Sequence, residues 1–485
     1  MTRSGAAYAA GLRDGRMVFI DGELVADVTT HPAFASSVRT VAGLYDLAND
    51  PANRELMTFP SPTTGEPVNL AFAIPRSRDD LARRRRAIRA WAEATLGLMG
   101  RSPDHVASYL AAFAGAADVF ARGGEQFARN VVAFHEYARD DDQYVTYTIV
   151  PPQIDRSNPG HRQPEPNLYA GVKEETDGGI VVKGAQMLGT GTAISDWILL
   201  SCIHPLPEGD EAQAISVAVP VGAPGVRIHS RRSYARAATS VFDYPLSTRF
   251  DETDSLVVFD DVLVPWEHVF VYRDRAITHA QFFETGAHAL GNNQAQIRFA
   301  VKLRFLAGVA HRVTEMLGMA ANPAVQATLG EIAAHAAMVE GLVEAQEACC
   351  EIDANGMAVP GRSPLYANML LQSSLYPAVL GLVRELCGGS LIQLPSSSKD
   401  FADPEIAADL ARYVRTATSP SEARVGLLKL AWDIVGSEFA GRHHQYEMFY
   451  AGAPHVVKGH MYRAYDFAAA GALVDAALDG VGLPP

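Results

Sequence analysis

The chain of 485 residues is 48% hydrophobic and 20% charged, and its formal net charge at pH 7 is −14. A chain of this length exceeds one ordinary core, so we expect two or three domains that share large interfaces. The acidic balance argues against nucleic acid as a partner, and because no apolar run approaches about 18 residues, we expect no membrane span.

Residues 1–145 are expected to form a mainly helical N-terminal domain. A hairpin is predicted at Met17–Val25, with Asp21-Gly22 at its turn, and the longer helical runs cover residues 83–98 and 105–137. The opening residues carry no continuous apolar segment, so they do not resemble a secretory signal.

One basic run interrupts this acidic chain. Arg83 to Arg86 and Arg89 fall in a helical pattern whose apolar side carries Leu81, Ile88 and Trp91. Such a pattern is typical of a solvated helix face, which is the interpretation that we adopt.

Residues 146–278 show a different period and are expected to form a β-barrel or sandwich domain. Short runs rich in Val, Ile, Thr and Tyr are separated by Pro, Gly and Asp, which is typical of closely spaced strands. The predicted strands are Tyr144–Val150, Ile180–Gln186, Trp197–Ile203, Ala214–Val221 and Ser255–Val264.

Residues 279–485 return to helix and are expected to form a C-terminal four-helix bundle and tail. Four apolar stripes alternate steps of three and four residues, as packed helices require. They begin at Leu303, Leu329, Leu375 and Val425. The order of an α-domain, a β-module and a bundle resembles the α+β fold of the acyl-CoA dehydrogenase superfamily.

Six ordered segments resemble the oxygenase components of the 4-hydroxyphenylacetate 3-hydroxylase family, from about residue 5 to 470. Together they are far more specific than a single glycine signature. The segments are Asp27–Phe34, Gly100–Asp104, Pro152–Ser157, Lys183–Gly191, Val257–Pro265 and Arg442–Gly452.

The resemblance implies an aromatic monooxygenase of the 4-hydroxyphenylacetate 3-monooxygenase kind, with FAD as its cofactor. FADH2 would come from a separate NAD(P)H-dependent reductase, and O2 would be the co-substrate. A phenol would be hydroxylated at its ortho carbon through a flavin C4a-hydroperoxide. No G-x-G-x-x-G motif follows a strand, so the chain is not expected to bind a nicotinamide cofactor itself. The family likeness also implies a homo-oligomer, a tetramer or a dimer.

Arg101 is the first candidate catalytic residue. Ser102 and Pro103 suit the N-cap and first position of a helix, so an arginine and the positive end of a helix are predicted to face one spot. An anion such as a phenolate suits that spot. A phenol with a pKa near 10 needs about 4 kcal/mol to ionise at neutral pH, which one arginine, a helix end and a proton acceptor can together supply. The alternative is that Arg101 pairs with Asp104.

His105 and Tyr147 are the other two candidate catalytic residues. Family members usually carry tyrosine at the first position and histidine at the second, so the pair looks exchanged in this chain. Both side chains still hydrogen-bond a substrate oxygen, and a His105 in the first helical turn should stay uncharged and accept a proton. Asn293 is a possible substrate-binding residue, where halophenol-hydroxylating relatives often carry histidine. Alternatively, His105 is an exposed first-turn residue, Tyr147 packs in the barrel, and Asn293 is a structural polar group.

The flavin is expected to contact three of the six segments and the strand before the first of them. Backbone N–H groups at the glycines would approach the ring closely. The predicted contacts are Tyr147, Thr148, Ile149, Gln153, Ile154, Asp155, Arg156, Thr190, Gly191, Arg442, Ala451, Gly452 and Ala453.

Three other functions compete with this interpretation. An acyl-CoA dehydrogenase needs a carboxylate base, for which Glu284 and Glu438 are candidates. A 4-hydroxybutyryl-CoA dehydratase needs iron–sulfur thiolates, and no cysteine lies near residue 100 or 300. The third is a non-catalytic flavin-binding protein.

The cysteines also bear on the cellular compartment. The four cysteines include the adjacent pair Cys349-Cys350 and show no C-x-x-C spacing, so we predict a reducing cytoplasm, no disulfide framework and no metal.

The identity of the phenol stays open. The candidates are 4-hydroxyphenylacetate, tyrosine, a coumarate, a simple phenol or a carrier-tethered tyrosyl group.

Overall fold

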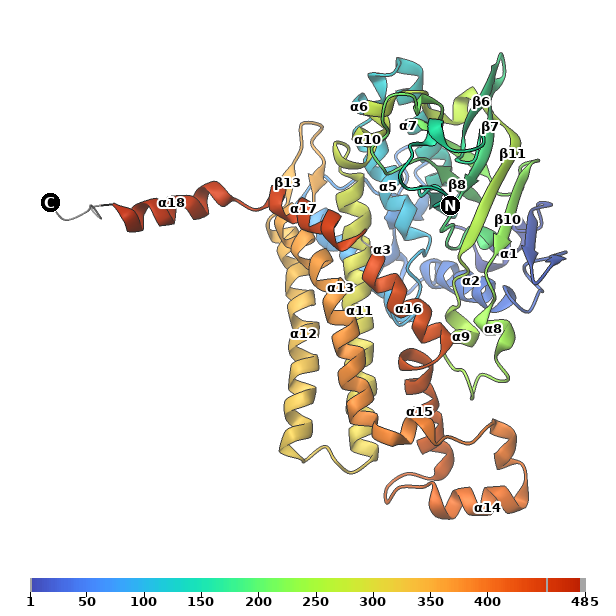
Figure 1. Ribbon diagram of the computed structural model, residues 1–485, viewed down its shortest axis with the longest axis vertical. Coiled ribbons are helices and arrows are strands. Elements are labelled where there is room, and N and C mark those ends of the chain that lie inside the picture. The colour runs from blue at the N-terminus through green and yellow to red at the C-terminus, as the bar shows by residue number, and fades with distance from the viewer. Residues whose placement is uncertain (1, 451, 480–485) are drawn as a thin grey trace.

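The computed structural model describes residues 2–450 and 452–479. Three long helices stand side by side on one side of the molecule, and the larger sheet lies on the other (Figure 1). The N-terminal helices lie between them, and the last helix projects away from the body. The N-terminal elements are α1 Gly5–Gly11, β1 Met17–Ile20, β2 Glu23–Leu24, α2 Ala35–Asn49, α3 Arg54–Met57, β3 Thr58–Pro60, β4 Pro67–Asn69, α4 Arg78–Ala94, α5 Asp104–Gly115, α6 Asp118–Ala121 and α7 Glu125–Asp140.

The predicted hairpin and all five predicted strands are confirmed. Asp21 and Gly22, with φ of 53° and 81°, form the left-handed turn between β1 and β2. The sequence analysis did not predict β6, β10 and β12. The middle elements are β5 Val145–Thr148, β6 Gly171–Thr176, β7 Gly179–Gln186, β8 Trp197–Leu200, β9 Ser216–Pro220, β10 Val226–Ser230, α8 Tyr234–Ala237, α9 Ser247–Phe250, β11 Ser255–Pro265 and β12 Val269–Val271.

The strands of the middle region lie in two sheets and do not close into one barrel, which is one of the two expectations. One sheet has six strands in the order β2-β1-β10-β11-β7-β6, and the other has four in the order β12-β9-β8-β5. Strand β1 comes from the N-terminal region and pairs in parallel with β10, with Val18 opposite Ile228. Parallel pairing requires a long connection, which short-range patterns do not reveal.

The four predicted stripes lie on α11, α12, α13 and α15. Helix α12 begins where Asn322 accepts a hydrogen bond from the N–H of Ala324, with Pro323 at the first position. Helix α13 packs between α11 and α12 and also touches α16 and α17. The C-terminal elements are α10 Arg275–Phe283, α11 Ala287–Met316, α12 Pro323–Ala348, β13 Glu351–Ile352, β14 Ala358–Val359, α13 Arg362–Cys387, α14 Pro404–Tyr413, α15 Ser421–Val435, α16 Glu438–Phe449, α17 Pro454–Ala464 and α18 Phe467–Leu478.

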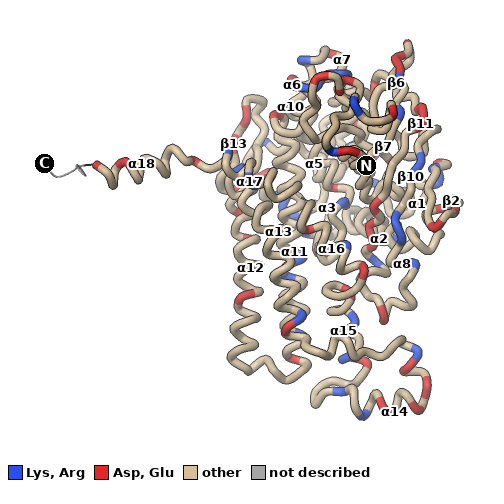
Figure 2. The backbone as a smooth tube through the Cα atoms, viewed as in Figure 1, with Lys and Arg blue, Asp and Glu red and all other residues tan. Residues whose placement is uncertain are grey.

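One helical stretch, Arg362–Ile392, is long and apolar enough by length and composition to cross a bilayer. A core helix of a bundle meets the same description, and the packing of α13 against α11, α12, α15, α16 and α17 is that of a core helix. Acidic and basic residues are scattered along the backbone tube in this view (Figure 2).

The expectation of a solvated arginine face on α4 is wrong. The side chain of Arg84 is buried, with 2% of its surface exposed. The Nε of Arg85 lies 2.5 Å from the Oε1 of Glu347, and the Nη2 of Arg89 lies 2.5 Å from the Oε1 of Glu340. Both glutamates are on α12. Acidic residues of α12 thus neutralise Arg85 and Arg89. These ion pairs let α4 pack against the bundle through part of its basic side.

A buried ionic cluster joins α11 to α16. Glu447 accepts hydrogen bonds from Arg298 at 2.7 and 2.8 Å and from Lys302 at 2.8 Å. The two cations lower the pKa of Glu447 to about 2, against the opposing effect of burial, and burial lowers the pKa of Lys302 to about 8. Because this cluster is closed to solvent, it holds α16 in a defined position against the bundle.

We predict that Glu447→Ala destabilises the fold by about 3–5 kcal/mol, because it leaves two buried cations without their carboxylate. Unfolding in guanidinium chloride measures the loss. The matched control is Glu340→Ala, which removes a partly exposed pair and should cost about 1 kcal/mol or less. Equal losses in the two variants would contradict this account of the cluster.

Candidate active site

The guanidinium of Arg101 is buried among phenol rings. Its Nη2 donates to the hydroxyl of Tyr147 at 2.8 Å, and its Nη1 donates to the hydroxyl of Tyr446 at 3.0 Å. Its central carbon lies 4.3 Å from the ring centre of Tyr450. Within the described parts of the chain the Arg101 side chain forms no ion pair, so the alternative of a pair with Asp104 is wrong. A buried cation surrounded by neutral hydroxyls is suited to receive an anion.

The segment that carries Arg101 is held from both sides. The backbone N–H of Arg101 donates to Glu252 at 2.6 Å. Ser102 does not cap helix α5 with its side chain; its hydroxyl donates to Asp104 at 2.5 Å, and Gln294 of α11 donates to the same carboxylate at 3.0 Å. Burial raises the pKa of Asp104 to about 6. A helix does begin in this segment, but it starts at Asp104, so Pro103 and not Ser102 is the N-cap residue and no side chain caps it.

His105 is buried beside Arg101, so the alternative of an exposed first-turn residue is wrong. Its ring centre lies 5.2 Å from that of Tyr147 and 5.3 Å from that of Tyr109. Its Nδ1 is buried and has no hydrogen-bond partner. Burial, and after it the charges of Arg101 and Arg298, hold the pKa of His105 well below its usual range. An uncharged imidazole with a free nitrogen can accept a proton.

Asn293 has a partner within the bundle. It lies on α11, is buried, and donates to Gln346 of α12 at 2.9 Å. The next residue, Gln294, reaches the Arg101 segment instead, through Asp104. Gly291, one turn earlier, lies so close to Tyr109 that a Cβ would sit 1.9 Å from its ring. Helix α11 thus meets the site through Gly291 and Gln294.

Two of the predicted flavin segments lie side by side. Val150 and Met187 form an isolated bridge, in which the N–H of Met187 donates to Val150 at 2.9 Å. Beyond that bridge, Ile154 is 48% exposed and Leu188 is 56% exposed, which is unusual for large apolar side chains. These side chains offer apolar surface to a flat ring. Arg156 donates to Gln153 within its own loop, and Asp155 accepts from Ser157 and Asn158.

Asp254 joins the second flavin segment, Lys183–Gly191, to the third, Arg442–Gly452. Thr190 donates to it at 2.7 Å, and Arg442 of α16 donates to it at 2.7 and 3.0 Å. The positions of Arg442 and Thr190 are thereby fixed. Gly191 has a φ of +76°, and a Cβ there would meet the Tyr144 hydroxyl at 2.9 Å. Only glycine fits this close approach without strain.

The remaining predicted contacts have varied environments. Thr148 and Ile149 are buried, and the Thr148 hydroxyl has no partner. Gly452 has a φ of +102°, and Ala453 precedes α17. Ala451 lies outside the described residues.

Sequence reasoning missed the acidic loop and two phenols. Glu252 and Asp254 belong to the run Asp251-Glu252-Thr253-Asp254, which directly precedes β11. Tyr446 and Tyr450 follow Arg442 at steps of four residues, so they share one face of α16. That spacing was the signal available in the sequence. Between residues 2 and 450 and between 452 and 479, no group of three metal-binding side chains lies together.

Neither glutamate considered as a dehydrogenase base lies in this site. Glu284 pairs with Arg122, and Glu438 pairs with Arg232; both glutamates are more than half exposed at the surface. The geometry therefore does not support an acyl-CoA dehydrogenase.

The buried His105 predicts a pH dependence of stability. The unfolded chain takes up a proton on this imidazole below pH 6.5, whereas the folded protein does not, so folded stability falls as the pH drops. His105→Gln removes this penalty. From pH 7.5 to pH 5 the stability of the variant relative to wild type should rise by up to about 2 kcal/mol, as denaturant unfolding at each pH would measure. The exposed His455→Gln serves as the control, and parallel curves for His105→Gln and wild type would contradict the prediction.

Comparisons with known proteins agree with this geometry. A family model described as the 4-hydroxyphenylacetate 3-hydroxylase N terminal matches residues 4–271, and the C-terminal model matches residues 278–479. The oxygenase component of a Rhodococcus 4-nitrophenol 2-monooxygenase is 37% identical, over 95% of this chain and 88% of the relative.

A second relative, from Streptomyces globisporus, is 36% identical over 93% of this chain and 85% of its own length. It is a monooxygenase of a 3-amino-3-(3-chloro-4-hydroxyphenyl)propanoyl group on a peptidyl-carrier protein. The crystal structure of a 4-hydroxyphenylacetate 3-monooxygenase oxygenase component with FAD and 4-hydroxyphenylacetate has a TM-score of 0.93 and 35% identity, and the match covers 99% of both chains. This chain therefore belongs to the 4-hydroxyphenylacetate 3-hydroxylase family.

Proposed function

We propose that the chain is the oxygenase component of a two-component aromatic monooxygenase, which uses FADH2 and O2 to hydroxylate a phenol at its ortho carbon. The FADH2 comes from a separate NAD(P)H-dependent reductase. The observation that carries the proposal is the buried guanidinium of Arg101, which donates to the neutral hydroxyls of Tyr147 and Tyr446 and has no carboxylate partner. A phenolate oxygen replaces those hydroxyls as a stronger acceptor.

The side chains around Arg101 divide the work of ionising the phenol. Arg101 holds the oxygen that becomes negative, and this charge-assisted hydrogen bond favours the phenolate by about 1.5–3 kcal/mol. His105 is assigned the role of proton acceptor, since its low pKa keeps the imidazole uncharged and its Nδ1 has no other partner. Tyr147 donates its hydroxyl to the substrate oxygen once that oxygen takes its place on Arg101. The ionised ring is then electron-rich at its ortho carbon.

The residues of this chain suit a flavin beside that ring. Ile154 and Leu188 offer exposed apolar surface on two adjacent loops, and Gly191 lies beside Arg101, since a Cβ added at Gly191 would be 3.9 Å from the Arg101 side chain. Arg442 has two carboxylate partners, Glu252 and Asp254, so we assign it the role of holding α16 and the Thr190 loop in place. Bound reduced flavin supplies the electrons that activate O2. The neighbouring phenol rings keep bulk water away from the reacting atoms.

The substrate class follows from the relatives and from the pocket. Relatives of similar identity act on 4-nitrophenol and on a carrier-bound chlorohydroxyphenyl group, so a para-substituted phenol is common to them. We propose a para-substituted phenol for this chain as well. Product formation from 4-hydroxyphenylacetate, tyrosine, 4-coumarate, 4-nitrophenol and a carrier-bound tyrosyl group, with a generic flavin reductase, identifies it; no catechol from any of them would contradict the proposal.

We predict that Arg101→Ala lowers the rate of hydroxylation by about 30- to 1,000-fold, because it removes about 2–4 kcal/mol of phenolate stabilisation. Oxidation of FADH2 should continue, with its electrons released as hydrogen peroxide. The ratio of product formed to O2 consumed measures this uncoupling. The control is Arg86→Ala, on the exposed side of α4, which should match wild type. If Arg101→Ala slows flavin oxidation and hydroxylation equally, Arg101 acts on the flavin or the fold and not on the phenol.

A further inference from the structure

A cavity lined by several arginines lies in the N-terminal region, and neither Arg101 nor Tyr446 lines it. Its volume is about 360 Å³, within the range of small-molecule sites. Its walls come from α4, α7 and the segment of residues 59–76, and its apolar surface includes Phe72 and Ile74. We call this cavity the arginine groove, because Arg76, Arg83, Arg84 and Arg139 all line it.

Three of the four arginines have no acidic partner. Arg76 donates to the carbonyl of Asn355, and Arg83 donates to the carbonyls of Thr58 and Glu55. Arg84 donates to main-chain carbonyls and a serine hydroxyl. Within the described ranges none of these three forms an ion pair. These three arginines lie together in a chain that has 55 acidic and 41 basic residues.

The acidic groups around the arginine groove offset only part of its charge, and Asp104, which is not bonded to Arg84, acts on that arginine through its charge alone. Arg139 pairs with Asp140 at 2.8 Å. Asp80 uses its carboxylate to accept from the N–H of Arg76 and the hydroxyl of Ser77, where α4 begins. Burial lowers the pKa of His135 to about 4, so its imidazole is uncharged at neutral pH. The positive charge of the remaining arginines is therefore in excess.

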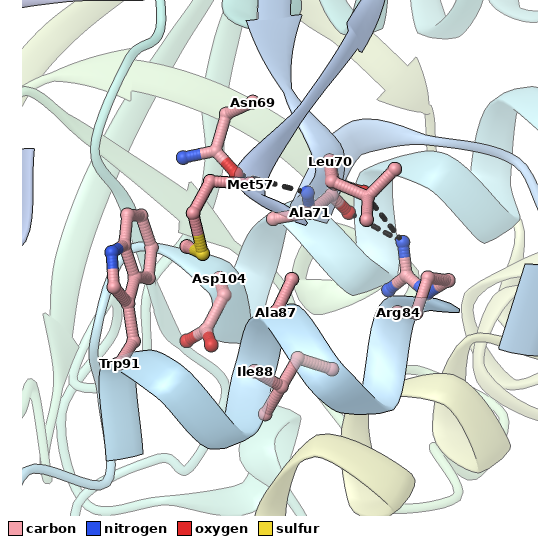
Figure 3. A pocket seen from close by; sticks show the side chains of 9 residues that line it. All are labelled: Met57, Asn69, Leu70, Ala71, Arg84, Ala87, Ile88, Trp91 and Asp104. Atoms are coloured by element: carbon pink, nitrogen blue, oxygen red, sulfur yellow. Dashed lines mark hydrogen bonds between the residues drawn. The ribbon is translucent and has the colours of Figure 1, made fainter. Parts of the chain in front are cut away.

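Arg84 is the innermost of these arginines. It also lines a small inner cavity of about 10 Å³, about the size of one water molecule, together with Trp91 and Asp104. Figure 3 shows its guanidinium turned toward the carbonyls of Leu70 and Ala71. Its Nε is buried and has no partner. A buried guanidinium with an unused donor and no carboxylate is a costly arrangement unless an anion completes it.

We propose that the arginine groove binds a small organic anion, a carboxylate or a phosphate monoester carried on an apolar body. The arginines recognise the anionic group, and Phe72 and Ile74 contact the apolar part. The site also touches the active-site helix, because Arg84 donates to Ser108 of α5 at 2.8 Å, and Ser108 donates to the carbonyl of Asp104. Anion binding in the arginine groove does not depend on the proposed hydroxylase activity.

Isothermal titration calorimetry of the full-length protein tests the proposal with phenyl phosphate, benzoate and the neutral benzyl alcohol. We expect saturable binding of at least one of the two anions and none of the alcohol. Arg83→Gln and Arg76→Gln should each weaken that binding by about tenfold or more. Arg86→Gln, on the same helix but outside the groove, is the matched control and should bind as wild type does. Thermal unfolding of each variant checks that the fold is retained.

Two further measurements separate this site from the catalytic one and from a mere change in fold. Arg101→Gln should bind the anion as tightly as wild type. Crystals soaked with 4-bromophenyl phosphate or 4-bromobenzoate should show an anomalous bromine peak in the arginine groove. The relative affinities of the two anions show which anionic group the site prefers. Absence of binding, a bromine peak only beside Arg101, or binding lost in Arg101→Gln but kept in Arg83→Gln and Arg76→Gln would overturn the proposal.

Discussion

The placement of one buried cation, Arg101, organises the candidate active site. Burying a guanidinium without a carboxylate costs several kcal/mol, so the surrounding structure must hold it in place. Its own backbone is fixed by Glu252, and its side chain is fixed by the hydroxyls of Tyr147 and Tyr446. These partners come from a loop, a strand and a helix that are far apart in the sequence. The two sheets and the bundle therefore have to pack correctly before the site exists.

The acidic loop of residues 251–254 provides much of that coordination. Glu252 binds the Arg101 backbone and also Arg442, while Asp254 binds Arg442 and Thr190. One short loop thus connects the phenol pocket, the second flavin segment and helix α16. Such a shared set of charge-assisted bonds fixes the distance between the two proposed binding regions, as a reaction between their occupants requires.

The buried cations discussed above fall into two groups, which differ in whether a carboxylate pairs with them. Arg298 and Lys302 are neutralised within the fold by Glu447, and such a closed cluster stabilises structure. Arg101 and Arg84 have neutral oxygen partners only, although both side chains are largely buried. The closed cluster needs no ligand, whereas the open cations retain capacity for an anion. This contrast separates structural from binding arginines more clearly than their positions in the sequence do.

The local elements and the family were determined by the sequence alone. The hairpin at Asp21-Gly22, the five strands and the four helical stripes follow from turn chemistry and from periods of two and 3.6 residues, which act between near neighbours. Arg101, His105 and Tyr147 were identified from the family resemblance and prove to lie together. Only the tertiary structure decided which neighbour each polar side chain meets. Arg84 and Arg86 stand two places apart in one basic run, yet one is buried and the other exposed, and Asn293 bonds within the bundle while Gln294 reaches the site. The physical reason is that burial and long-range pairing depend on which elements pack together, and no local period encodes that choice.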